Sequence, residues 1–327
     1  MKQIMGTADF LAMISPDAGI KIGREIQLGR ENVQKTILAN EDIFDRIAFH
    51  QPFAHVAMYG EDQTGHLVKI HLQDGMIKRI LVTPGITARK IKLTVAYDGT
   101  EFYGFQFQKK ERTIQGELEK AISEMNGNNT TCHGASRTDS GVHAFGQVVD
   151  FETDRDFTEK RWLSSLNKIL PKDIMIRQAE FAPKLFHSRY DVWKKEYRYS
   201  LNIGDADPKF RHTEWPIGPL KDMEKLADNL KMLVGTHDFT SFATGEKEDM
   251  VRTIYETNLV IRDNKVEIDI LGDGFLHHMV RLIVCQLVEI ANGRSDTSIR
   301  EIIMEKSRKH TVRMAPPNGL CLYNIEY

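Results

Sequence analysis

Two kinds of hydrophobic periodicity recur along the chain and predict a mixed α+β fold. Apolar residues alternate with polar ones, or run together, in short segments typical of strands: 91–97, 147–152, 174–182, 194–203, 252–262, 265–272 and 319–327. Apolar residues three and four positions apart predict helices at 113–127, 159–170, 220–235, 275–293 and 298–308. These elements recur in two rounds without strict strand–helix alternation. We therefore expect two similar halves with mainly antiparallel strands around a central cleft.

A separate unit precedes these two rounds. Pro84 and Gly85 interrupt the pattern and place a boundary after residue 89. Before it, strands are predicted at 55–60, 66–75 and 78–82, and a helix at 32–49. We expect a small α+β domain over 1–89, a first half of the main domain over 90–190 and a second half over 191–327. No motif in the first of these units indicates a chemical role.

Composition restricts the class of protein. Of the 327 residues, 41% are hydrophobic and 28% are charged, with a formal net charge of −2, so bulk charge does not hold this chain on nucleic acid. A local basic groove is still compatible with that average. The three cysteines are scattered and form no CxxC motif, and the most apolar segment, 282–291, is far shorter than the ~20 residues of a membrane span. No secretory signal opens the chain, and we expect a cytoplasmic protein with no membrane association.

The segment 133–152, "HGASRTDSGVHAFGQVVDFE", combines charge with rigidity. Arg137 and Asp139 lie between Gly134 and Gly141, and an apolar strand follows directly. Charged groups on a loop that a rigid scaffold holds are typical of catalytic sites. An aspartate before Ser-Gly is, however, more often a turn former whose carboxylate caps nearby backbone amides. Composition alone favours that turn interpretation.

Arg281 presents a similar choice. The predicted helix 275–293 is apolar over so wide an arc that we expect it to be sandwiched between layers. A guanidinium buried there needs a carboxylate partner, because an unpaired buried charge is very costly. Alternatively, Arg281 extends to solvent past His277 or His278, and spacing alone favours this second interpretation.

Several histidines raise the question of a metal site: His133, His143, His187, His277 and His278. Neighbouring residues on a helix point about 100° apart, and the sequence has no HExxH motif and no Cys/His ladder. We therefore expect no bound metal.

Taken together, the segments from about residue 90 to the C-terminus resemble the TruA family of tRNA pseudouridine synthases. The matching motifs occur in the family's order: "KLTVAYDGTEFYGFQFQ", "GASRTDSGVHAFGQ", "FHSRYDVWKKEYRY", "HDFTSFA", "GDGFLHHMVRLIV" and "APPNGLCL". Three positions depart from the family pattern, namely Ser136 for glycine, Tyr190 for phenylalanine and Asp273 for asparagine. The larger departure is the extension 1–89, which ordinary family members lack.

The resemblance implies roles for particular residues. Asp139 corresponds to the family's catalytic aspartate, and Arg281 to the arginine that pairs with it. Tyr197 corresponds to the active-site tyrosine that stacks on the target base, Leu320 to an apolar residue that closes the pocket, and Arg137 to the arginine that enters the RNA stem. Further substrate contacts are expected from matching positions in the same motifs: Gln106, His143 and Gln147.

The resemblance also implies a reaction and its partners. Uridine would be isomerised to pseudouridine on the 3′ side of the anticodon stem-loop of tRNA, after the base is flipped out of the stem. The reaction needs no cofactor, and family members act as homodimers with tRNA across both subunits. Rival interpretations are an RNA-binding module without catalysis and a histidine-based metal hydrolase. For 1–89 we consider an added RNA-binding or dimer-supporting domain, or a fused domain with an unrelated ligand.

Overall fold

The computed structural model describes residues 47–49, 56–62, 67–73, 76–83, 86–245 and 249–327. The first of its two sheets is antiparallel, in the order β1 (Ile47–Phe49), β2 (Ala57–Asp62), β3 (Leu67–Gln73) and β4 (Met76–Thr83). The three strands predicted in this region are therefore confirmed. The predicted helix 32–49 lies outside the described residues except for its last three, which form β1, so the prediction is wrong at that end.

The second sheet has ten strands and contains both rounds of elements. Its main path runs β11 (Gly235–Asp238), β12 (Val251–Arg262), β13 (Lys265–Gly272), β9 (Lys194–Asn202), β14 (Leu320–Glu326), β7 (His143–Thr153), β5 (Arg89–Tyr97) and β8 (Ile174–Ala182). Two short strands lie beside this path, β6 (His133–Gly134) on β7 and β10 (Trp215–Pro216) on β9.

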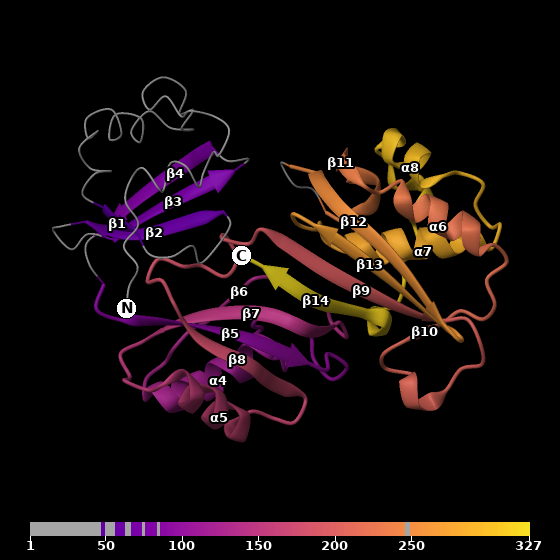
Figure 1. The fold of residues 1–327 in the computed structure, drawn as a ribbon. Coiled ribbons are helices and arrows are strands. Elements are labelled where there is room, and N and C mark those ends of the chain that lie inside the picture. Colours follow the sequence, from indigo (N-terminus) through magenta and orange to yellow (C-terminus); the bar gives the residue numbers. More distant parts are fainter. Residues whose placement is uncertain (1–46, 50–55, 63–66, 74–75, 84–85, 246–248) are drawn as a thin grey trace.

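The C-terminal strand β14 joins the two halves of this sheet. It pairs antiparallel with β9 of the second half and parallel with β7 of the first, and Figure 1 shows it in yellow between them. Most other pairings are antiparallel, as the α+β class predicts. Both halves therefore share one continuous sheet, and loops from each half can meet at the junction.

The helices lie with their own half of the sheet (Figure 1). The first half carries α4 (Ile114–Asn126) and α5 (Glu159–Ile169), and the second carries α6 (Met223–Lys231), α7 (Met279–Ala291) and α8 (Ile299–Glu305). Thr113 caps α4, because its side chain accepts a hydrogen bond from the Gly116 amide. Among the described residues, no helix is both long and apolar enough to cross a membrane.

Helix α7 begins later than the sequence predicts. The apolar pattern places its start at residue 275, but His278 has a left-handed φ of 64°, and the helix begins at Met279. A residue in that conformation cannot continue a right-handed helix. From Met279 onward nearly every side chain is buried, which agrees with the expected position of the helix between layers.

Candidate active site

A cavity of about 610 Å³ opens where the two halves meet. The first half supplies residues 103–106 and the loop 134–140, and the second half supplies residues 275–281. Tyr197 on β9 and Leu320 at the start of β14 complete the wall, so the central strands of the shared sheet form part of the cavity. The volume lies within the range of small-ligand sites in proteins.

Asp139 and Arg281 meet in this cavity. Arg281 donates from Nη1 to Asp139 Oδ2 at 3.0 Å and from Nε to the Ala315 carbonyl at 2.9 Å. The residue is only 8% exposed, so the alternative in which it extends to solvent is wrong. The guanidinium is held at two of its nitrogens, and it aims a fixed positive charge at the carboxylate.

The loop that carries Asp139 packs against the backbone of residues 104 and 105. Gly104, with φ +85°, lies so close to it that an added Cβ would be 2.9 Å from the Thr138 carbonyl oxygen. The neighbouring Phe105 amide donates to that same oxygen at 3.0 Å. Within the described part of the chain, the Asp139 carboxylate caps no backbone amide, in contrast to the turn interpretation.

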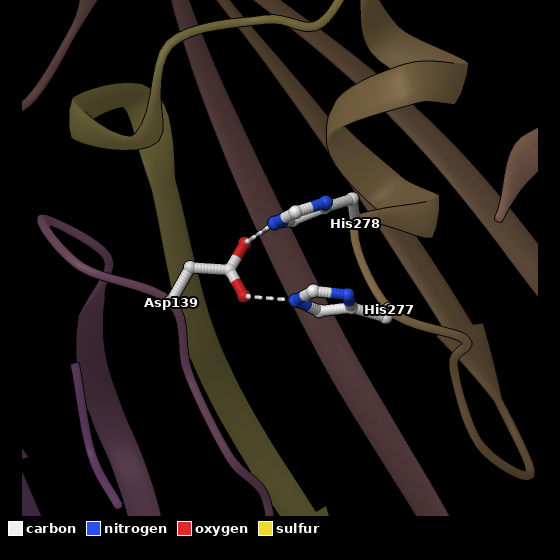
Figure 2. Close-up of side chains that lie close together, drawn as sticks. All are labelled: Asp139, His277 and His278. Atoms are coloured by element: carbon white, nitrogen blue, oxygen red, sulfur yellow. Dashed lines mark ion pairs between the residues drawn. The ribbon is translucent and has the colours of Figure 1, made fainter. Parts of the chain in front are cut away.

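Two histidines also face this carboxylate (Figure 2). His277 Nε2 lies 3.7 Å from Asp139 Oδ1, and His278 Nε2 lies 3.5 Å from Oδ2. Their rings stack at 3.7 Å, and each Nδ1 is hydrogen-bonded to the hydroxyl of Thr244, at 2.9 and 2.7 Å. We expected neighbouring histidines to diverge. They converge because both precede the helix and His278 is left-handed, which the spacing of the residues did not indicate.

Burial controls the charge of His278. Loss of solvent around the ring lowers its pKa below the usual value, against the attraction of Asp139, and the nearby His277 and Arg281 lower it further. At neutral pH His278 is therefore an uncharged imidazole. The fixed cation beside Asp139 is the guanidinium of Arg281, which stays protonated in proteins.

Asp139, His277 and His278 could together hold a metal ion. Their ligand atoms all lie within 4.8 Å of one another, and nitrogen and oxygen donors of this kind suit zinc. Thr244 fixes the two rings from behind, as partners of metal-binding histidines do. Arg281 disfavours metal binding, because its guanidinium is already paired with Asp139 Oδ2 and would repel a second cation there.

Tyr197 forms an aromatic wall beside Asp139. Its hydroxyl is hydrogen-bonded to Ser136 Oγ at 2.9 Å, and its ring meets Phe275 edge-on at 5.0 Å between centroids. Burial raises the pKa of Tyr197 to about 12, so the hydroxyl stays protonated at neutral pH. Ser136, where the family pattern has glycine, thus anchors the tyrosine.

The structure separates the other predicted substrate contacts into two groups. Arg137, Gln106 and Leu320 line the cavity, whereas His143 and Gln147 do not. Gln147 is fully buried and hydrogen-bonds both the amide and the carbonyl of Ser136, at 3.2 and 2.7 Å. It therefore supports the loop 134–140 and does not line the cavity, and its contact with substrate stays a prediction.

His143 is also buried in the wall rather than exposed to the cavity. Its Nδ1 accepts from the Gly99 amide at 3.1 Å, and its Nε2 lies 2.6 Å from the His212 carbonyl oxygen. Neither His143 nor any later residue of β7 lines the cavity, so its contact with substrate stays a prediction.

Two further cations line the cavity that we did not predict, Arg189 and Lys195. Both lie in the "FHSRYDVWKKEYRY" motif, in which we had assigned a role only to Tyr197. Together with Arg137 they place three positive side chains at the cavity, although the chain as a whole has a net charge of −2. A local basic groove of this kind is compatible with a near-neutral chain.

Comparison with known proteins identifies the family of this chain. A family model described as tRNA pseudouridine synthase matches residues 93–191 and 230–327. The chain is 40% identical over 243 residues to tRNA pseudouridine synthase A of Anoxybacillus flavithermus, covering 73% of this chain and 99% of the relative. It is 42% identical over 245 residues to tRNA pseudouridine synthase A 1 of Bacillus cereus, covering 73% and 98%. The chain belongs to the TruA family of tRNA pseudouridine synthases, which are isomerases that modify tRNA.

Proposed function

We propose that the enzyme converts uridine to pseudouridine on the 3′ side of the anticodon stem-loop of tRNA, and that Asp139 starts the rearrangement. The observation that carries this proposal is the Asp139 carboxylate, held by the buried Arg281 at a cavity whose wall includes Tyr197 and Leu320. The resemblance to the family's motifs supports the choice of target.

The reaction breaks the N1–C1′ bond of uridine, turns the base and joins C5 to C1′. The target atom cannot be reached inside a stem, so the nucleotide is extruded at a cost of a few kcal/mol. In this proposal the uracil enters between Tyr197 and Leu320, and Arg137 at the cavity takes the space it leaves. A flat base suits an aromatic wall on one side and an apolar one on the other.

Asp139 acts as a carboxylate, either as the nucleophile at the sugar or the base, or as the base that starts elimination toward a glycal. Arg281 stabilises the negative charge and fixes the direction of the oxygens. The proton at C5 leaves at the end of the reaction, and N1, whose bond to C1′ was broken, takes up a proton, so that the product is an isomer of the substrate. His278, an uncharged imidazole 3.5 Å from Asp139, is placed to take up that proton.

The proposed partner is tRNA, bound by a homodimer in the cytoplasm. Arg137, Arg189 and Lys195 provide phosphate-binding charge at the cavity, although the chain as a whole carries −2. In the proposed homodimer, a second copy of these residues would add to the basic surface. Cys132, Cys285 and Cys321 are free thiols in the structure, which fits a reducing compartment.

Tritium release from tRNA labelled at C5 of uridine tests the proposal. We expect Asp139→Asn to abolish release, while Asp228→Asn, which changes an exposed carboxylate, leaves release unchanged. The modified positions are then mapped in the product tRNA. Release by Asp139→Asn at the wild-type rate would exclude Asp139 as the catalytic group, and modification confined to another stem would exclude the anticodon target.

A further inference from the structure

A buried ion pair joins the N-terminal sheet to the segment 185–191 of the main domain. Asp191 is fully buried, and Lys69 Nζ on β3 lies 2.6 Å from its Oδ1 and 2.8 Å from its Oδ2. The Tyr59 hydroxyl on β2 donates to the same Oδ2 at 2.6 Å. A carboxylate buried this deeply depends on its partners, because it has no solvent to replace them.

The same contacts hold both ends of that segment. Lys69 Nζ also donates to the Leu185 carbonyl at 2.9 Å, and Asp191 Oδ2 accepts from the His187 amide at 2.8 Å. Between them, Phe186 is fully buried in one cluster with Ala57 and Tyr59 of β2. The N-terminal sheet thus binds the segment by charge, by side-chain hydrogen bonds from Lys69 and Tyr59, and by apolar packing.

The segment leads directly to the cavity. Arg189, which lines the cavity, lies two residues after His187 and two before Asp191. The neighbouring Ser188 is held by the first half of the main domain. Its amide donates to Asp150 at 2.7 Å, and its hydroxyl donates to the His133 carbonyl at 2.7 Å. The backbone on both sides of Arg189 is therefore clamped, and one of the two clamps comes from the N-terminal sheet.

We infer that the N-terminal sheet positions Arg189 for contact with the tRNA backbone, with Lys69 and Tyr59 as positioning residues that act through Asp191. This inference rests on the proposed function, since it takes tRNA as the ligand. A guanidinium binds phosphate best when its direction is fixed in advance. The family model begins at residue 93, so this control of the segment comes from chain that lies outside the family match.

The competing explanation is that the sheet only stabilises the fold. The two explanations differ in what happens to tRNA affinity in enzyme that is still folded. Lys69→Met keeps the apolar stem and removes the cation that lies 2.6 Å from Asp191, although His71 Nε2 remains 3.8 Å from the same carboxylate. Lys231→Met is a matched control, because Lys231 forms an ion pair with Asp228 that is largely exposed.

The experiment measures KM and kcat for tRNA by tritium release, tRNA affinity by filter binding, and thermal unfolding, all on the full chain. We expect Lys69→Met to raise KM and the dissociation constant roughly tenfold with kcat within about twofold, and Lys231→Met to change neither. Tyr59→Phe, which removes one hydrogen bond and keeps the ring, should give a smaller rise. It also provides a folded variant if Lys69→Met fails to fold.

Epistasis with Arg189 identifies the route of the effect. In an Arg189→Ala background, Lys69→Met (or Tyr59→Phe) should raise KM no further, because its effect passes through the missing guanidinium. A lower unfolding temperature with unchanged tRNA affinity would overturn the inference, and so would an equal rise in KM with and without Arg189. Wild-type protein that binds tRNA but releases no tritium would refute the proposed function, while the binding comparison would still test the role of Lys69.

Discussion

Arg281 and Asp139 are 142 residues apart in the chain and are joined by a hydrogen bond of 3.0 Å. One residue lies on the buried helix α7 and the other on the loop before β7, so the bond crosses from the second half to the first. The site therefore exists only when the two halves are assembled on their shared sheet. The correct assembly of the fold and the pairing of Asp139 with Arg281 are therefore the same event.

Arg281→Lys tests whether direction matters as well as charge. Lysine keeps the cation, but its single nitrogen cannot reproduce the two contacts to Ala315 and Asp139 at fixed angles. We expect kcat to fall about 100-fold with little change in KM, which is the signature of an interaction needed in the transition state. Arg294→Lys is the control, since Arg294 contacts Glu289 with two nitrogens on the surface. Equal effects at both positions would contradict a catalytic role for Arg281.

The sequence predicted most elements because their signals are local. The strand predicted at 174–182 matches β8 at both ends, and the helix predicted at 113–127 agrees with α4 to within one residue at each end. The left-handed His278 was not predictable, because this conformation is rare outside glycine and leaves no trace in an apolar pattern. The convergence of the two histidines on Asp139 was missed for that reason.

Long-range relationships needed the structure or the family resemblance. Nothing in the spacing of Arg281 identified Asp139 as its partner, and the residues alone favoured solvent exposure. The single sheet that unites both halves depends on β14 pairing with both β9 and β7, which periodicity cannot indicate. The attachment of Lys69 to Asp191 was likewise invisible, because an isolated lysine on a strand is usually exposed.

Tyr197→Phe separates the two roles of the tyrosine. The ring keeps its contact with Phe275, while the hydrogen bond to Ser136 is lost. Because burial raises the pKa of Tyr197 to about 12, its hydroxyl does not ionise near neutral pH, and we expect activity within roughly tenfold of wild type. Tyr197→Ala removes the stacking wall and should cost at least about 100-fold. A Phe variant as inactive as the Ala variant would instead make the hydroxyl essential.

Metal ions should inhibit this enzyme rather than assist it. Asp139, His277 and His278 are placed to bind an ion, but an ion there would take the proposed catalytic carboxylate away from Arg281. We expect prolonged dialysis against EDTA to leave turnover unchanged, and added Zn²⁺ to inhibit. His277→Asn should raise the inhibitory Zn²⁺ concentration at least roughly tenfold, relative to its own metal-free activity. Loss of activity on chelation that a metal restores would show that the ion is a cofactor.

His278 should make the folded protein less tolerant of acid. Its pKa in the fold is lowered by burial, so the unfolded chain takes up the proton first as the pH falls through roughly 6.5. As the pH falls further, the free energy of unfolding decreases until the pH passes below the folded-state pKa. Above about pH 7.5 His278 is uncharged in both states and does not make the free energy of unfolding depend on pH. Urea unfolding of wild type and His278→Asn at pH 7.5 and 5.5 measures this. We expect the variant to lose less stability than wild type on acidification. Equal losses would show that the folded and unfolded pKa values of His278 are the same, and a larger loss in the variant would show that the folded value is raised.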